Sequence, residues 1–289
     1  MEIEAQVAFA MARAWWPGWL ADPLSRPIVD GLAWYLQGRV VPALFDLSFL
    51  RPGYQADSVR LFGDAVPWAF PLLTLGQPGP RLPRGADPGT PRMALAWATI
   101  ERMVGWPALE GALATLGESA STRSMPPAEI AQVVSSATGY PLGWFLAVAL
   151  DPARTFDYQL GSVVTRACND PSCIRTDVTV INRGNTAFDS PVAQGPYDTS
   201  GILEIRVAFA DGQTVSSRWN GREPSRVLSF ESIAAPIRVE LDPDRVLMLD
   251  RSRLDDRWQA APAAELAPTW VAWWLLWLQD ASLSYSGLF

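Results

Sequence analysis

Hydrophobic and polar positions follow different periods in the two halves of the chain. Up to about residue 150, apolar residues recur every three or four positions between loops rich in Pro and Gly, a pattern that predicts helices. The expected helices cover residues 7–16, 30–45, 91–105, 107–116 and 124–139. The last of them carries proline in its first turn and glycine at its end. Residues 50–91 are dense in Pro and Gly and predict mostly loop.

From about residue 156, β-branched and polar residues alternate, which is typical of strands that bury one face. The alternating runs are residues 177–184, 201–219, 226–232 and 236–250. Asp211-Gly212 divides the second run and predicts a hairpin turn. We therefore expect an α+β protein. Its expected parts are a helical subdomain at 1–153, an antiparallel β-sandwich at 154–250, and a linker with an apolar C-terminal helix at 251–289.

The C-terminal segment has four tryptophans at helical spacing. Trp270, Trp273, Trp274 and Trp277 share one face of the expected helix. Such a face packs on its own domain, on a partner protein or at a membrane interface, and the sequence leaves all three open. No apolar run is long enough to span a bilayer, and the N-terminus lacks the pattern of a signal peptide. The compartment is therefore undetermined, and peripheral membrane association on the cytoplasmic or the periplasmic face stays open.

Two missing residue types restrict the chemistry more than any motif that is present. The sequence contains no histidine and no lysine, so all 23 basic residues are arginine, and the formal net charge is −7. Such an acidic chain is poorly suited to nucleic acid. Serine, cysteine and zinc catalysis usually need histidine or lysine. Carboxylate, tyrosine or arginine chemistry remains, or no catalysis, and we expect no metal or other cofactor.

The two cysteines, Cys168 and Cys173, flank the turn-forming residues Asn-Asp-Pro-Ser. The pair could face each other across a hairpin and form a disulfide. Two free thiols in a reducing compartment are the alternative, and the sequence leaves both open.

The order of the segments resembles the C-terminal part of the M1 family of zinc aminopeptidases, the gluzincins. In that family a His-Glu-x-x-His helix, ending in a Trp-Trp-Gly-like stretch, precedes a helix with the third zinc ligand, a tyrosine segment and a β-sandwich. Here "FAMARAWWPG", "VDGLAWYLQ" and "TPRMALAWATIERMVG" resemble the three segments that form the site. "GYPLGWFLAVAL" resembles the helix before the sandwich, and "RVELDPDRVLMLD" resembles its closing strands.

Carried over residue by residue, the resemblance implies a site that has lost its catalytic residues. Phe9 and Arg13 stand at the two histidine positions, and Ala10 stands at the glutamate position. Thr90 stands at the tyrosine position, and Asp30 lies near the third ligand. Phe9 offers no lone pair and Arg13 stays protonated, so neither would bind zinc. We expect an Arg13–Asp30 ion pair to fill the former metal site.

The resemblance therefore implies a pseudoenzyme, a non-catalytic structural or interaction protein. It would be an accessory or scaffold subunit of a larger, membrane-bound complex. In the family a sheet-rich half-domain precedes the zinc helix, whereas this sequence begins at that helix. We expect a protein partner to cover the apolar face that the half-domain would cover.

Three other functions stay open. A peptide-binding module would line a relic substrate groove with aromatic residues, although at helical spacing these are more often core. Those residues are Trp15, Trp16, Trp34 and Tyr35. A carboxylate-dependent hydrolase would use paired aspartates, although Asp-Pro-Asp is also ordinary turn chemistry. Its candidates are Asp242, Asp244, Asp250, Asp255 and Asp256. A split enzyme would take zinc ligands from another chain, but the family draws its ligands from segments present here.

Overall fold

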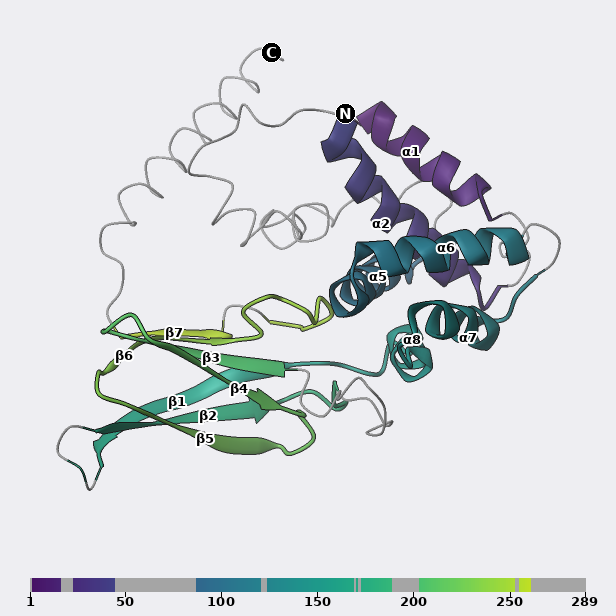
Figure 1. The fold of residues 1–289 in the computed structure, drawn as a ribbon. Helices are drawn as coiled ribbons and strands as arrows, with labels where there is room; N and C mark the ends of the chain where they lie inside the picture. Colours follow the sequence, from purple (N-terminus) through teal and green to yellow (C-terminus); the bar gives the residue numbers. More distant parts are fainter. Residues whose placement is uncertain are drawn as a thin grey trace, which may run out of the picture.

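The computed structural model of the protein describes residues 2–16, 23–44, 87–120, 124–168, 170, 173–188, 203–252 and 255–260. Within these residues helices come first and strands second, and the two groups lie at opposite ends of the molecule (Figure 1). This arrangement confirms the α+β class. The helices are α1 (Glu2–Ala14), α2 (Arg26–Leu44), α5 (Thr90–Val104), α6 (Trp106–Ala120), α7 (Pro127–Thr138) and α8 (Gly143–Leu150).

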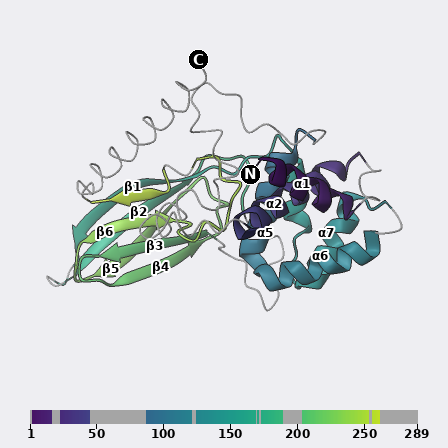
Figure 2. The same ribbon diagram turned by 90° about the horizontal axis from the view of Figure 1, so that it is seen from above.

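The helices α1, α2 and α5 form a packed series in which α2 contacts both of the others (Figure 2). The crossing of α2 and α5 is close at Gly31, where an added Cβ would lie 2.3 Å from the Cβ of Met93. A side chain at this position would push the two helices apart. Trp97 of α5 is fully buried, and its indole Nε1 donates to the carbonyl of Ile28 at 3.1 Å. This crossing fixes the position of Asp30, the neighbour of Gly31, relative to the start of α5.

The strands form two antiparallel sheets. One sheet has the order β1 (Tyr158–Ala167), β2 (Ile174–Asn182), β5 (Ser225–Ser232). The other has the order β4 (Thr214–Trp219), β3 (Leu203–Phe209), β6 (Pro236–Leu241), β7 (Arg257–Gln259). Buried residues alternate along β3, and Tyr158 of β1 meets Trp219 of β4 edge to face with ring centroids 5.6 Å apart. The two sheets therefore bury side chains against each other.

Both hairpins indicated by the sequence are present. The β3–β4 turn contains Gly212 with φ of 88°, and the N–H of Phe209 donates to the carbonyl of Gln213 at 2.9 Å. The β1–β2 hairpin ends at Cys168 and Cys173, which are joined by a disulfide. The N–H of Cys168 also donates to the carbonyl of Cys173 at 3.0 Å. Of the two states left open for the cysteines, the structure has the bridged one.

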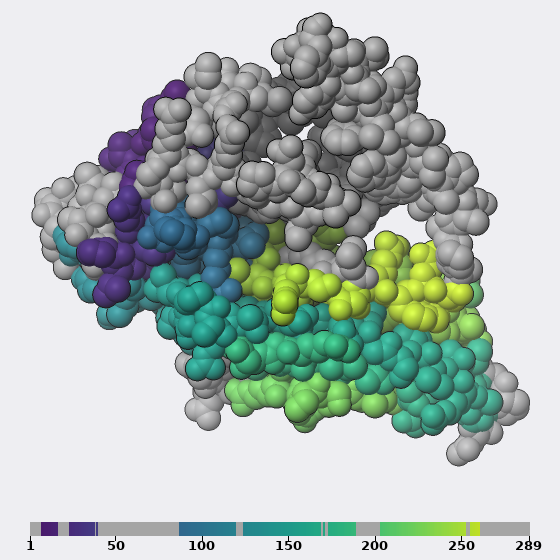
Figure 3. Space-filling view, turned by 180° about the vertical axis from the view of Figure 1, so that it is seen from behind, coloured from purple at the N-terminus to yellow at the C-terminus, as the bar shows by residue number. Residues whose placement is uncertain are grey.

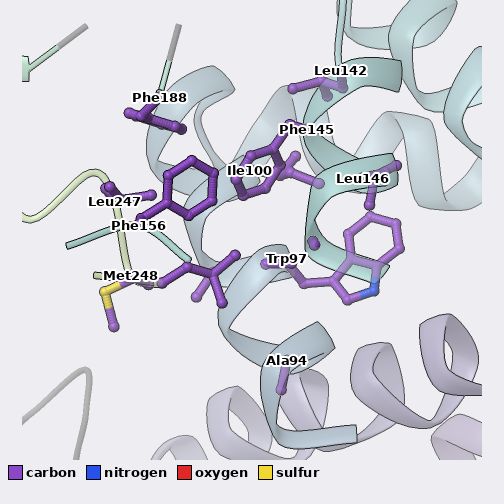
Figure 4. Packing of buried hydrophobic residues seen from close by; sticks show 14 of the residues in the cluster. Ala94, Trp97, Ile100, Leu142, Phe145, Leu146, Phe156, Phe188, Leu247 and Met248 are labelled. Atoms are coloured by element: carbon purple, nitrogen blue, oxygen red, sulfur yellow. The ribbon is translucent and has the colours of Figure 1, made fainter. Parts of the chain in front are cut away.

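Aromatic side chains join the helices to the sheets (Figure 4). Phe145 of α8 meets Phe188 with ring centroids 5.8 Å apart, and Phe188 meets Phe156 at 5.7 Å. On the other side of this junction the N–H of Met248 donates to the hydroxyl of Thr99 in α5 at 3.0 Å. The helical and sheet regions therefore share one continuous buried core.

The strand prediction was wrong in two places. β1 lies outside the alternating runs identified in the sequence, and residues 245–250, expected to continue a strand, form no strand: they are irregular apart from a turn at 248–249 and an isolated bridge from Asp250 to Phe156. Asp242 and Arg245 have φ of 45° and 52°, and such left-handed residues interrupt a strand. The second sheet also extends past the expected boundary at residue 250, because β7 pairs with β6.

Candidate functional site

Asp30 lies at the centre of an ion cluster between α1, α2 and the residues that lead into α5. Its side chain is 0% exposed, whereas the side chain of Arg13 is 24% exposed. Arg13 Nε lies 2.8 Å from Oδ1 of Asp30, and Arg26 Nε lies 3.7 Å from Oδ2. The backbone N–H of Asp87 donates to Oδ2 at 2.9 Å. The ion pair expected between Arg13 and Asp30 is present, and we call these four residues the Asp30 cluster.

The chemistry of this cluster is electrostatic and structural. A carboxylate that is fully removed from water needs positive charge and hydrogen-bond donors around it, and Asp30 receives both. The guanidinium of Arg13 would repel a divalent cation at this position. Across the described residues, no group of three or more His, Cys, Asp or Glu side chains could hold a metal ion. The arrangement ties three segments of chain together through one buried charge.

The other residues that the resemblance selects lie in different environments. Phe9 is buried, on the same side of α1 as Arg13, whereas Ala10 is exposed. Thr90 is buried as the first residue of α5, and its N–H donates to the carbonyl of Asp87 at 3.0 Å. The structure therefore brings Arg13, Asp30 and the segment that ends at Thr90 together, and it places Ala10 on the outer face of α1.

A second polar cluster lies farther along α2 and was not identified from the sequence. The hydroxyl of Tyr35 donates to the carboxylate of Glu101 in α5, and Arg39 pairs with the same carboxylate. The guanidinium carbon of Arg39 also lies 3.8 Å from the ring centroid of Trp106. Burial and then the neighbouring Glu101 raise the pKa of Tyr35 far above its usual value. In the sequence, the i, i+4 spacing of Tyr35 and Arg39 indicates that their side chains share one face of a helix, and this spacing could have pointed to the cluster.

Three of the four aromatic residues considered for a peptide groove are buried, namely Trp16, Trp34 and Tyr35. This burial fits the core position that their helical spacing favours. The fourth, Trp15, is 73% exposed.

Trp15 belongs to an exposed apolar face of α1. Val7 and Met11 lie in α1 at four-residue spacing before Trp15, which directly follows the last residue of the helix, and all three are exposed. Ala10 and Ala14 lie between them and are exposed as well. The purple residues of this helix lie at one edge of the molecule (Figure 3). We call Val7, Ala10, Met11, Ala14 and Trp15 the α1 face, and it carries no charged side chain.

The aspartates considered for a hydrolase serve turns and ion pairs. The carboxylate of Asp242 accepts the backbone N–H groups four and five residues later, at 2.8 and 2.9 Å. Asp250 accepts the N–H of Tyr158 at 3.4 Å, and Asp244 pairs with Arg206 at 2.9 Å. These contacts fit the turn interpretation. The remaining two, Asp255 and Asp256, directly precede β7.

The four C-terminal tryptophans, Trp270, Trp273, Trp274 and Trp277, lie outside the described residues. Among the helices that are described, none is both long and apolar enough to cross a membrane. A comparison with models of known protein families found no match, and a search of curated proteins found no significantly similar sequence.

Proposed function

We propose that this protein is a non-catalytic interaction subunit, built on the fold of the C-terminal part of an M1 peptidase, with its two sheets forming the β-sandwich of that fold. The observation that carries the proposal is the Asp30 cluster. An arginine from α1 and an aspartate from α2 meet at the position where the resemblance expects zinc ligands from the same two segments. A buried ion pair there replaces catalysis with a structural contact.

The α1 face supports an interaction role. Exposed apolar side chains at helical spacing, without charges between them, mark surfaces that other proteins cover. The bound partner would then hold this chain within a larger assembly, at a membrane in the simplest version of the proposal.

The relationship to a zinc site can be tested by restoring its ligands. The double substitution Phe9→His and Arg13→His places two imidazoles on the side of α1 that faces Asp30, which becomes the third ligand. The matched control, Ala10→His and Ala14→His, has the same spacing on the exposed side of the helix. We expect the first variant to bind Zn²⁺ at least about tenfold more tightly than the control.

Zinc affinity is measured by competition with a chromophoric chelator, after circular dichroism has shown that both variants are folded. Adding Asp30→Asn to the first variant should lower its affinity to that of the control. Equal affinities of the two histidine pairs would contradict the proposed origin of the site. Stoichiometric zinc in the unaltered protein would contradict the loss of catalysis.

The interaction role is tested by affinity purification of the full chain from membranes of the source cell. We expect one protein to co-purify in stoichiometric amount, and the variant Met11→Glu with Trp15→Glu to lose it. Val227→Glu is the matched control, because Val227 is also exposed but lies on β5. A compact monomer that purifies alone, or a partner that is retained by the α1 variant, would contradict this role.

A further inference from the structure

The strand β5 forms an open edge of the three-stranded sheet. Its eight residues pair with β2 without a register shift, and Figure 2 shows it on the side of the sheets opposite β1. Two other edges are interrupted. The β1–β2 ladder is irregular between Leu160 and Val163, the N–H of Leu160 donates to the carbonyl of Asp255, and β7 has only three residues. β5 therefore lacks the interruptions that keep an edge strand from pairing with another chain.

The backbone groups at this edge follow from the alternation of an antiparallel ladder. The N–H of Asn182 donates to the carbonyl of Pro224 at 2.9 Å, and this pair continues the register of β2 with β5. Every second residue of β5 therefore points its N–H and C=O toward β2, and the residues between them point theirs outward. The outward residues, all with exposed side chains, are Ser225, Val227, Ser229 and Glu231. Within the described part of the chain, no other backbone group bonds to them.

A second strand of the same sequence fits this edge. In an antiparallel pair of two β5 strands, one register opposes all four outward residues, with Ser225 opposite Glu231 and Val227 opposite Ser229. The two-fold axis of this pair passes between the two copies of Leu228, on the side of the sheet that faces the core. Val227, which is 58% exposed, lies diagonal to its own copy on the outer side. Apolar side chains therefore meet at the axis on both faces of the sheet.

The charged residues of β5 are compatible with the same register. Arg226 lies opposite Phe230 of the second copy, where the guanidinium can stack on the ring. Glu231 lies opposite a serine, so no two like charges are directly opposed. Sliding the second strand by two residues would leave outward groups of β5 without a partner at the ends of the pair. The sequence of β5 therefore favours one register with itself.

We propose that β5 binds β5 of a second copy of this chain and joins the two three-stranded sheets into one continuous antiparallel sheet. Both copies use the same surface, as in other dimers with a two-fold axis. A single pair of strands buries little surface, so we expect a dissociation constant in the micromolar range. The α1 face takes no part in this contact, and the dimer does not depend on the function proposed above.

Sedimentation equilibrium of the full chain, at concentrations up to about 200 µM, measures the dimer. The substitution Val227→Pro removes an outward N–H from each copy and leaves the ladder with β2 intact. We expect it to raise the dissociation constant at least about tenfold. The matched control is Thr214→Pro on the edge strand β4. Its N–H also points outward, because the neighbouring Gln213 is the residue that bonds to β3, through Phe209. This control should keep the dimer.

Three outcomes of this measurement would overturn the proposal. They are an unaltered chain that stays monomeric over the whole range, a dimer that Val227→Pro leaves unchanged, and a dimer that Thr214→Pro weakens equally. The variant Met11→Glu with Trp15→Glu should keep the dimer. Its loss in that variant would place the contact on the α1 face instead of on β5.

Cross-linking tests the register without a proline substitution. Leu228→Cys places two thiols opposite each other, with Cα atoms about 4.5 Å apart, within the reach of a disulfide. The native cysteines are already bridged and leave no competing thiol. Val227→Cys is the control, because its thiol is more exposed but lies two residues along the strand from its copy, beyond the reach of about 7 Å. We expect mild oxidation to give a covalent dimer of the Leu228 variant in at least about tenfold higher yield. Equal yields, or a higher yield from the Val227 variant, would overturn the proposed pairing.

Discussion

The helical and sheet regions each contain one aspartate held by two arginines, and the two clusters differ mainly in burial. Asp30 lies 2.8 and 3.7 Å from its two arginines, and Asp177 lies 3.0 and 3.7 Å from its own. The side chain of Asp30 is 0% exposed and that of Asp177 is 16% exposed. The arginines beside Asp177 are the more exposed pair, at 69% and 51%.

Nearly equal distances therefore do not mean equal contributions to stability. Removing one partner from a buried pair leaves a charge without water or counterion, whereas an exposed pair returns to solvent when it is broken. The buried cluster also connects segments that are distant in sequence, while the Asp177 cluster lies on one face of a single sheet. The buried Asp30 cluster therefore contributes to the stability of the fold, whereas the Asp177 cluster is a solvated ion-pair group that contributes little.

The largest expected effect is that of Arg13→Met, which keeps the aliphatic stem and removes the charge. Asp30 would retain Arg26 at 3.7 Å and the Asp87 N–H, but lose its nearest cation. We expect the free energy of unfolding to fall by about 3 kcal/mol, measured by urea denaturation at pH 7. In a double-mutant cycle with Asp30→Asn, the two losses should be smaller together than their sum. Additive losses would show that the pair is not energetically coupled.

The second effect concerns the buried Tyr35. Burial, and then the carboxylate of Glu101, raise the pKa of its hydroxyl in the folded state. The unfolded chain loses that proton near pH 10, so the contribution of Tyr35 is complete below pH about 10 and is lost as the pH rises further. We expect the contribution of Tyr35 to lower the free energy of unfolding by up to about 1.4 kcal/mol for each pH unit above this value.

Urea denaturation between pH 8 and 11 measures that slope. The substitution Tyr35→Phe removes the titrating hydroxyl and should make this pH slope shallower. It also removes the hydrogen bond to Glu101. If the slope is the same in both proteins, groups other than Tyr35 cause the loss of stability at alkaline pH.

The change from helices to strands could be predicted from the sequence. A helix or strand that buries one face has apolar residues at regular intervals, about every four positions in the first half of the chain and every two in the second. α7 begins with proline and ends at Gly139 in the left-handed region, as its sequence indicated. The β3–β4 turn was predictable because Asp211-Gly212 fits the backbone that such hairpins need. Local chemistry decided all of these features.

Features set by distant contacts were harder to predict. β1 alternates weakly, because many residues in its second half are exposed at the edge of a three-stranded sheet. Residues 246–249 are apolar because they pack against α5 and the sheet junction, and this burial resembled a strand in the sequence. The partner of Asp30 was predicted only through the family resemblance, and Glu101 was not linked to Tyr35 because 66 residues separate them.

A third and smaller effect is expected for Arg175→Met, the sheet counterpart of Arg13→Met. Arg175 contacts Asp177 and the hydroxyl of Ser229, but it is half exposed. We expect a loss below about 1 kcal/mol at low salt. Because solvent reaches this pair, added salt should reduce the loss further, whereas the loss for Arg13→Met should change little. Urea denaturation in 0.02 and 0.5 M NaCl compares the two, and an equal salt response would remove the distinction between the clusters.

The smallest effect is the acid response of Asp177. Hydrogen bonds from Ser229 and Arg175 lower the pKa of this carboxyl, with the charges of Arg175 and Arg166 adding to the effect. A carboxyl with a lowered folded-state pKa contributes stability above its unfolded value of about 3.9, and that contribution is lost as the pH falls through the folded-state value.

The difference in unfolding free energy between the unaltered protein and Asp177→Asn should therefore be constant from pH 5 to 7 and shrink below pH about 4. Its size should stay under about 1 kcal/mol, because solvent screens the partners on the exposed face of the sheet. Thermal or urea unfolding at each pH gives the difference directly. A difference that grew on acidification would mean that protonation of Asp177 stabilises the fold, and the two clusters would then differ in sign as well as in burial.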